Sequence, residues 1–277
     1  MLPDGRRPGR RPVSVAAAAA ALAAAYSFQD PLWDDGYAEV ATYQASRVIY
    51  GQPRAHSAAA VVVKEDMDPA QHVKWDNPGP GALSVLKLNV AAVAQTDNYP
   101  YDFFLTVFVR RDDPRKVVKL VTNTHEHCGT TFHMLKGWTD PAGLSWNSYF
   151  DGEGDGTALV PLPAGTLLED QLPVALRALP FQAGYTEQDS IVRTFVGNRH
   201  RPIVTTPATI SVVSKDGADG WKVTVRGDKL AQTYWFAAVP PHVLRKFESD
   251  DGRALTIQGE ALRTKYWERP AKVKGMP

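Results

Sequence analysis

The feature that most constrains this chain is the regular recurrence of turn signals between runs of β-branched and aromatic residues. Gly51-Gln52-Pro53-Arg54, Asp112-Asp113-Pro114-Arg115 and Asp250-Asp251-Gly252 are examples. Pro fixes φ, Gly tolerates positive φ and Asp bonds to the nearby backbone, so these clusters favour turns. About a dozen strands at spacings of roughly 10–15 residues are typical of an antiparallel sheet or barrel. The pattern lacks the alternation of strands and helices that a doubly wound nucleotide-binding fold requires.

We expect a mainly β fold, a curved antiparallel sheet or an open, clamshell-like β-barrel with one amphipathic helix. The expected strands cover 38–50, 55–65, 83–95, 101–111, 116–127, 132–138, 144–150, 190–196, 203–215, 221–226, 232–237, 242–249 and 253–267, with a long loop over 66–82. In Tyr101–Arg111 both alternating faces are apolar, because Phe104 and Phe108 face away from Phe103 and Leu105. That strand is therefore predicted to be covered on both faces or to line an apolar cavity.

Helical periodicity is clear in one segment. The apolar positions Leu167, Leu168, Leu172, Ala175, Leu176 and Leu179 recur at spacings of three and four residues, with Gln171 on the same face. Glu169, Asp170 and Arg177 occupy other positions. We expect a helix over 166–179 that begins near or bends at Pro173 and ends before Pro180.

The first residues have the three parts of a secretory signal peptide. Four arginines precede an uncharged, alanine-rich stretch from Val13 to Ala25, which ends in small residues. That stretch is too short to span a bilayer as a helix. We expect a signal peptide over 1–25, a linker over 26–35, a single β-rich domain over 36–267, a flexible tail over 268–277 and no transmembrane segment in the mature chain. The mature protein is expected in the periplasm or outside the cell.

Charge and cysteine content exclude several classes. The chain has 277 residues, 31 Lys plus Arg, 30 Asp plus Glu and a formal charge of +1. Removing residues 1–25 changes this charge to −2, because four arginines and one aspartate lie there. A strongly basic nucleic-acid binder is therefore not expected. A single Cys cannot form an internal disulfide.

The densest chemistry lies in residues 124–133. Three of the seven histidines (His125, His127 and His133) and the only cysteine fall there. His125 and His127 share one face of a strand, and a reversal after Cys128 would bring His133 opposite His125. Three imidazoles on one face could hold zinc with an open fourth position, as in a catalytic site. The simpler interpretation is a partly exposed strand with polar residues on its outer face.

Cys128 admits two interpretations. As a nucleophile it would need a partnered base and a lowered pKa, which nearby histidines could supply. As a packed residue it would behave as a small, inert hydrophobe. We favour the inert residue.

Three stretches carry a resemblance to a known family. They are Trp33-Asp34-Asp35-Gly36-Tyr37-Ala38-Glu39 with Tyr50-Gly51-Gln52-Pro53-Arg54, then Glu126-His127-Cys128-Gly129, and then residues 149–155 with Glu169-Asp170-Gln171-Leu172. They resemble a family of exported, uncharacterised bacterial proteins, many labelled "septum formation inhibitor Maf". True Maf proteins are cytoplasmic nucleotide pyrophosphatases with a Ser-x-Ser-Pro-Arg-Arg type motif near the start, which this chain lacks. The resemblance implies no established activity, and it favours the Cys-Gly pair and its Glu over the histidines.

These observations lead to three functional hypotheses. The first is a non-catalytic envelope protein that binds an apolar or amphiphilic ligand such as a lipid, or an envelope partner. The second is a metal-dependent hydrolase that uses His125, His127 and His133. The third is a purely structural interaction module.

Overall fold

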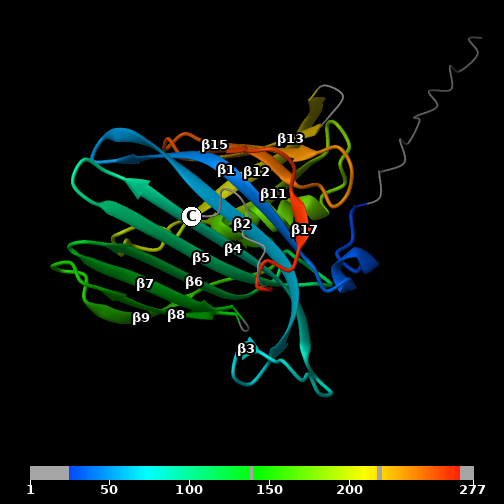
Figure 1. Ribbon diagram of the computed structural model, residues 1–277, viewed down its shortest axis with the longest axis horizontal. Coiled ribbons are helices and arrows are strands. Elements are labelled where there is room, and N and C mark those ends of the chain that lie inside the picture. The colour runs from blue at the N-terminus through cyan, green and yellow to red at the C-terminus, as the bar shows by residue number, and fades with distance from the viewer. Residues whose placement is uncertain (1–24, 138–139, 217–219, 269–277) are drawn as a thin grey trace, which may run out of the picture.

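The computed structural model describes residues 25–137, 140–216 and 220–268, in which seventeen strands form one hydrogen-bonded sheet (Figure 1). The strands of the first half are β1 (Ala38–Ile49), β2 (Gln52–Asp68), β3 (Val73–Lys74), β4 (Leu83–Gln95), β5 (Pro100–Arg110), β6 (Val117–Glu126), β7 (Gly129–Lys136), β8 (Ala142–Ser148) and β9 (Asp155–Val160). Those of the second half are β10 (Thr166–Leu168), β11 (Thr186–Val192), β12 (Thr205–Asp216), β13 (Gly220–Gly227), β14 (Leu230–Ala237), β15 (Leu244–Ser249), β16 (Ala254–Ile257) and β17 (Leu262–Thr264). The helical pieces are η1 (Pro31–Asp34), η2 (Glu169–Gln171), α1 (Leu172–Ala175) and η3 (Leu176–Ala178).

The sheet is curved and open. Strands β4 to β9 pair in sequence order, β2 joins β4 to β1, and β1 pairs with β16, from which the order runs back to β11 and β10. Strands β9 and β10 are therefore the two edges, and within the described residues no ladder joins them. Only residues 161–165 connect them, a distance of no more than about 20 Å. The sheet must curl until its edges approach, which confirms the predicted open barrel.

The helical segment lies inside this curl (Figure 1) and is shorter than expected. The predicted start at Thr166 is wrong, because Leu167 and Leu168 pair in parallel with Ile191 and Val192 of β11. Helical geometry runs from Glu169 to Ala178, and Pro173 lies in the first turn of α1 as expected. The predicted apolar face is buried throughout. Glu169, Asp170 and Arg177 are buried as well, which amphipathic periodicity did not predict.

The segment predicted as a linker is part of the core. Phe28 and Trp33 are 1% and 2% exposed, and Trp33 Nε1 donates to Tyr26 Oη at 2.9 Å. Arg111 donates to the carbonyl of Phe28 and pairs with Asp34 at 2.6 Å. The linker prediction is therefore wrong for residues 26–35. The predicted signal peptide, apart from residue 25, and the tail beyond residue 268 lie outside the described residues.

Several strand boundaries also differ from expectation. β2 continues to Asp68 and pairs with β3, inside the segment predicted as a loop. β9 was not predicted, and residues 253–267 form two short strands in place of one. β11 ends at Val192, so residues 193–196 leave the sheet and enter the interior of the barrel. Within the described residues, no helix combines the length and apolarity needed to cross a bilayer.

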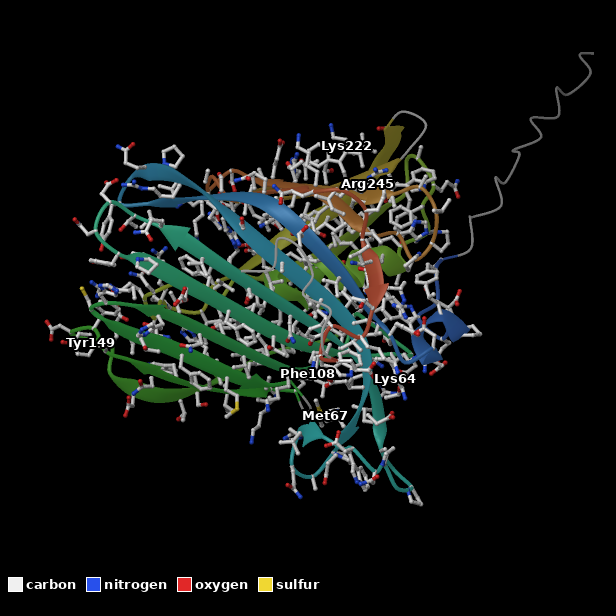
Figure 2. All side chains as sticks on the ribbon, in the orientation of Figure 1. Lys64, Met67, Phe108, Tyr149, Lys222 and Arg245 are labelled. Carbon is white, nitrogen blue, oxygen red and sulfur yellow. The ribbon has the colours of Figure 1, made fainter. Side chains whose placement is uncertain are left out.

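Side chains alternate between the two faces of the sheet along its strands, and Figure 2 shows all described side chains on the ribbon. On β5, Phe103, Leu105, Val107 and Val109 are buried against the interior. On the outer face Phe104 is 41% exposed, while Phe108 packs on the small cluster of Met67, Val85 and Val118. The prediction that this strand lines an apolar cavity is confirmed by the site described next.

Candidate functional site

An apolar cavity of about 140 Å³ lies against the concave face of the sheet. Its floor consists of inward-facing side chains of four strands, Ala45 of β1, Ala58 of β2, Ala92 and Val90 of β4, and Phe103 and Leu105 of β5. The register makes Ala58 and Ala92 direct neighbours, and Ala92 a neighbour of Phe103. Alanine fills little space above a strand, so this row of small residues leaves a hollow.

The opposite wall comes from the second half of the chain. It includes Pro173 of the helical segment, Val196, and Tyr234, Leu244, Phe247 and Leu255 of strands β14 to β16. Tyr43 fixes the distance between the two walls, because its buried hydroxyl donates to the carbonyl of Leu244 at 2.8 Å. An apolar cavity of about 150 Å³ in another protein stays dry and binds benzene. The hollow is thus large enough for a group of about six carbons.

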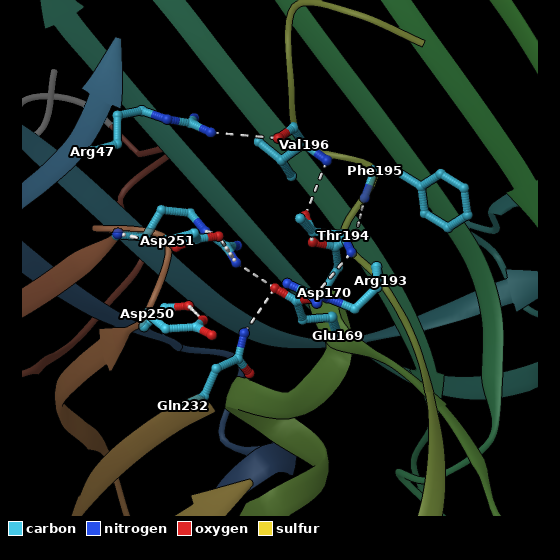
Figure 3. A network of polar contacts seen from close by, with 12 residues as sticks. Arg47, Glu169, Asp170, Arg193, Thr194, Phe195, Val196, Gln232, Asp250 and Asp251 are labelled. Atoms are coloured by element: carbon cyan, nitrogen blue, oxygen red, sulfur yellow. Dashed lines mark hydrogen bonds and ion pairs between the residues drawn. The ribbon is translucent and has the colours of Figure 1, made fainter. Parts of the chain in front are cut away.

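Arg47 lies beside this apolar hollow. It follows Tyr43 and Ala45 on the inward face of β1, and its guanidinium lies 3.6 Å from the centre of the Phe103 ring. One donor, Nη2, reaches the carbonyl of Val196 at 3.4 Å (Figure 3). Within the described part of the chain, no carboxylate lies within ion-pair distance of Arg47. Burial, then the charge of Arg253, lowers the pKa of Arg47 to about 10.

A network of buried charges closes the end of the cavity nearest the helical segment (Figure 3). Glu169 accepts hydrogen bonds from Arg253, from Arg193 Nε at 2.7 Å and from Gln232 Nε2 at 2.8 Å. These partners come from three separate segments of the chain, and Arg253 also pairs with Asp251. The arginines keep the pKa of Glu169 below its usual value despite burial. Glu169 therefore joins the helical segment to the surrounding strands as an ionised group.

The neighbouring Asp170 differs from Glu169 in its partners and in the direction of its pKa shift. Its carboxylate accepts from Thr194 Oγ1 at 2.5 Å and from the backbone N–H of Phe195 at 2.9 Å. Within the described residues it has no cationic partner at ion-pair distance. Burial is the main cause that raises the pKa of Asp170 to about 6, and the charge of Glu169 adds to it. Asp170 anchors residues 194–196, which form part of the cavity wall, without a compensating charge.

A second buried ion pair ties the helical segment to β1. Arg177 Nη1 pairs with Glu39 Oε1 at 2.8 Å, and both side chains are less than 5% exposed. Arg177 Nε also donates to the carbonyl of Pro173 at 3.0 Å. This pair holds η3 against the start of β1, so the helical segment is fixed at both ends by charges.

The predicted histidine site is not assembled. The β6–β7 register places Thr130 opposite His125 and Thr122 opposite His133, so the expected contact between His125 and His133 is wrong. His125 is exposed on the outer face of β6 and His127 is exposed in the hairpin turn, whereas His133 is 2% exposed and faces the interior. Within the described residues, no three His, Cys, Asp or Glu side chains are grouped to hold a metal ion. The reason is sheet geometry, because cross-strand partners share a face, and His133 lies three residues beyond Thr130, the partner of His125, an odd number that places it on the opposite face.

His133 instead belongs to an internal polar cluster. Its Nδ1 lies 3.1 Å from Thr122 Oγ1 and its Nε2 lies 3.1 Å from His200 Nδ1. His200 stacks on Trp146 at 4.0 Å, and its backbone N–H donates to Glu153. Burial, then the neighbouring His200, lowers the pKa of His133 to about 4. This cluster attaches the segment after residue 196 to strands β6 to β8.

Cys128 is exposed at the tip of the β6–β7 hairpin, so the prediction of a packed cysteine is wrong. Its backbone N–H donates to Glu126 Oε2 at 2.7 Å, and its Sγ lies 3.6 Å from Tyr99 Oη. Tyr99 in turn stacks on His127. Within the described residues, the thiol has no histidine at hydrogen-bond distance that could act as its base.

The residues that build the cavity were missed by motif reasoning, but one signal was available. Along the inward face of β1 the alternate positions Ala41, Tyr43, Ala45, Arg47 and Ile49 are apolar except for Arg47. A charge that interrupts an apolar face is a candidate for function. Glu169 and Asp170 likewise stand between the apolar pairs Leu167-Leu168 and Leu172-Pro173.

A second hollow, of about 540 Å³, lies near the seam between the sheet edges and is lined by Arg110, Arg115, Lys116, Asp113 and residues 162–167. Arg115, the most buried cation of this second hollow, already forms ion pairs with Glu187 and Asp189, each at 2.6 Å. The apolar cavity with its unpaired arginine is therefore the candidate site.

Comparison with known proteins gives one structural similarity. No family model and no curated protein matches the sequence. The fold is similar to a crystal structure described as a β-barrel-like protein of domain of unknown function DUF1849 from Brucella abortus. The two chains are 11% identical, the TM-score is 0.47, and the match covers 82% of this chain and 96% of that one. That protein is β-rich and of unknown function, and the chain described here is β-rich by its own strand pairing.

Proposed function

We propose that this protein is a non-catalytic binding protein that holds a small apolar or amphiphilic ligand between the concave face of β1, β2, β4 and β5 and the helical segment. The observation that carries the proposal is the cavity of about 140 Å³ over the row of Ala45, Ala58 and Ala92. A well-packed interior leaves few voids larger than a water molecule. A hollow with apolar walls and a few polar groups beside it is therefore a candidate binding site for a small ligand.

The position of the site supports binding over catalysis. The polar groups next to the cavity are engaged in holding segments together, as Glu169 does with Arg193, Arg253 and Gln232. The hydrolase hypothesis required three histidines on one face, and the sheet register separates them. We further propose that the protein acts in the periplasm or outside the cell, as its basic, alanine-rich N-terminal stretch predicts.

The proposal is tested with 1-hexanol, whose chain matches the size of the cavity, and with a matched pair of variants on one strand. Ala58 of β2 is 1% exposed and lines the cavity, whereas Ala55 of β2 is exposed. Ala58→Leu fills the hollow and is expected to weaken hexanol binding by about tenfold, while Ala55→Leu adds the same atoms outside it and leaves binding unchanged. Dissociation constants are measured by NMR titration at protein concentrations where both variants are folded by circular dichroism.

Native mass spectrometry of the protein isolated from its own cells provides an independent test. A co-purified small molecule that Ala58→Leu removes and Ala55→Leu retains would support the proposal. Equal hexanol binding by Ala58→Leu and the unmodified protein would refute the assigned cavity. Absence of binding by hexanol and by its charged analogues would refute the binding function itself.

A further inference from the structure

We infer that the cavity selects amphiphiles with an anionic head group, a carboxylate or a phosphate, which Arg47 binds while the aliphatic tail occupies the hollow. This inference rests on the proposed function, because it names the chemical class of ligand for the same cavity. It depends on three features of the molecule: the free donors of Arg47, the charges around it, and the apolar floor beside it.

The guanidinium of Arg47 is held in place with donors to spare. An arginine carries five N–H donors in a rigid fork. Stacking on the Phe103 ring at 3.6 Å fixes the plane of this fork, and the Val196 carbonyl accepts from one nitrogen, Nη2, at 3.4 Å. The remaining donors match the geometry of a carboxylate or phosphate, which a guanidinium binds through two parallel hydrogen bonds.

Within the described residues, none of the charged groups around Arg47 forms an ion pair with it. The nearby arginines Arg253 and Arg193 are paired with Glu169, and Arg253 is also paired with Asp251. Asp170 accepts hydrogen bonds from Thr194 and from the N–H of Phe195, and its negative charge lies near Arg47 without pairing with it. Arg201, a further cation near Arg47, is exposed and adds positive charge. Among the described residues, Arg47 is therefore the one arginine lining the hollow without a carboxylate at ion-pair distance, although the charge of Asp170 acts on it from farther away.

Burial strengthens the preference for an anionic ligand. Desolvation is the largest cause of the lowered pKa of Arg47, and the charge of Arg253 is the second. A partly buried cation without a direct ion-pair partner gains from an anionic ligand, because the interaction is less screened there than in bulk water.

The apolar floor sets the rest of the ligand. Phe103 contacts Arg47 on its face and also lines the hollow together with Ala92 and Leu105. A head group at Arg47 thus places its first methylene groups over Phe103 and its tail above the alanine row. His56 lines the same hollow beside Arg47, but its Nδ1 already contacts the Arg54 carbonyl at 2.9 Å. The head group is therefore assigned to Arg47.

The test compares four ligands with one tail: hexanoate, hexyl phosphate, 1-hexanol and hexylamine. They are titrated by NMR at pH 7 into the unmodified protein, Arg47→Gln, Arg47→Lys and the control Arg110→Gln, which removes a half-exposed arginine, paired with Asp112, from the far end of β5. We expect hexanoate or hexyl phosphate to bind about tenfold more tightly than hexanol. Arg47→Gln should abolish this advantage and leave hexanol binding intact, Arg47→Lys should retain part of it, and Arg110→Gln should retain all of it.

The outcomes separate the inference from the proposed function. Equal affinity for hexanol and both anions, or a preference for hexylamine, would refute selection of an anionic head group. The assignment of the cavity as the binding site would be unaffected. An advantage of the anions that survives Arg47→Gln would overturn the role of Arg47. The stronger of hexanoate and hexyl phosphate identifies the head group, and an advantage for either supports the inference.

Discussion

Two regions of this molecule carry concentrated polar chemistry, and they differ in every physical respect. The tip of the β6–β7 hairpin presents His125, His127 and Cys128 to solvent, where they lie on one short stretch of chain. At the start of the helical segment, Glu169 and Asp170 are buried and collect partners from segments 24 or more residues away. In the first region the polar residues are close together along the sequence. In the second region they come from distant parts of the sequence and meet in the folded structure.

The comparison teaches that burial decides which polar groups matter to the fold and to the cavity. An exposed side chain loses little when it is removed, because water replaces its contacts. A buried carboxylate that holds two arginines and an amide is costly to disturb, because its partners would remain desolvated and unpaired. The following predictions test this contrast.

The largest effect is expected for Glu169→Ala. The substitution leaves Arg193, Arg253 and Gln232 without their shared acceptor. We expect the free energy of unfolding to fall by about 3–5 kcal/mol, measured by urea denaturation. His125→Ala, at the exposed hairpin tip, is the control and should change it by less than about 0.5 kcal/mol. Equal losses in the two variants would contradict the contrast.

The Glu39–Arg177 pair allows a sharper test. Arg177→Met alone leaves Glu39 buried and uncompensated, with an expected loss of about 3 kcal/mol. The double variant Glu39→Leu/Arg177→Met removes both charges and should be more stable than Arg177→Met, since two apolar groups need no partner. A double variant that is no more stable than Arg177→Met would show that Glu39 does not depend on Arg177 for compensation of its charge.

Asp170 should make the free energy of unfolding depend on pH. Burial raises the folded-state pKa of Asp170 to about 6, above the value near 3.9 of an unfolded chain. The folded state holds this proton more tightly, so stability from Asp170 is lost as pH rises from about 4 to about 6. Asp170→Asn should remove that loss, on the order of 2–3 kcal/mol.

The measurement is the difference in unfolding free energy between Asp170→Asn and the unmodified protein at each pH. The difference is needed because His133, whose folded pKa is lowered to about 4, contributes the opposite slope over an overlapping range. Its stability is lost as pH falls from about 6.5 to about 4. A difference that stays constant between pH 4 and pH 7 would contradict an uncompensated Asp170.

The smallest effect is expected at Cys128. Its thiol is exposed, so a thiol reagent should modify it in the native protein without prior unfolding. Cys128→Ser should change the free energy of unfolding by less than about 0.5 kcal/mol. A buried, slowly reacting thiol or a large loss of stability would show that the hairpin tip is as tightly packed as the region around Glu169.

Sequence reasoning predicted the class of fold because turn chemistry and strand alternation are local. The strands β4, β5 and β6 were located within a few residues, and the apolar helical face was identified. The buried charges could not be predicted in the same way, since Glu169 meets Arg253 only after the sheet has curled. His133 shows the converse, because the register differs by three residues from the predicted pairing with His125, and this odd difference places His133 on the interior face in place of the predicted outer cluster. Arg47 was accessible to a period-two analysis of β1, which would have shown it on an apolar face.

The unpaired edges β9 and β10 have a mechanical consequence. In a closed barrel, the number and stagger of the strands fix the circumference, so the interior cannot grow without breaking backbone hydrogen bonds. Here the described ladders end on either side of a gap that only residues 161–165 bridge. Widening the gap costs side-chain contacts across it and leaves every ladder intact. The interior volume of this shell is therefore set by side-chain packing across the gap and not by a closed ring of backbone hydrogen bonds.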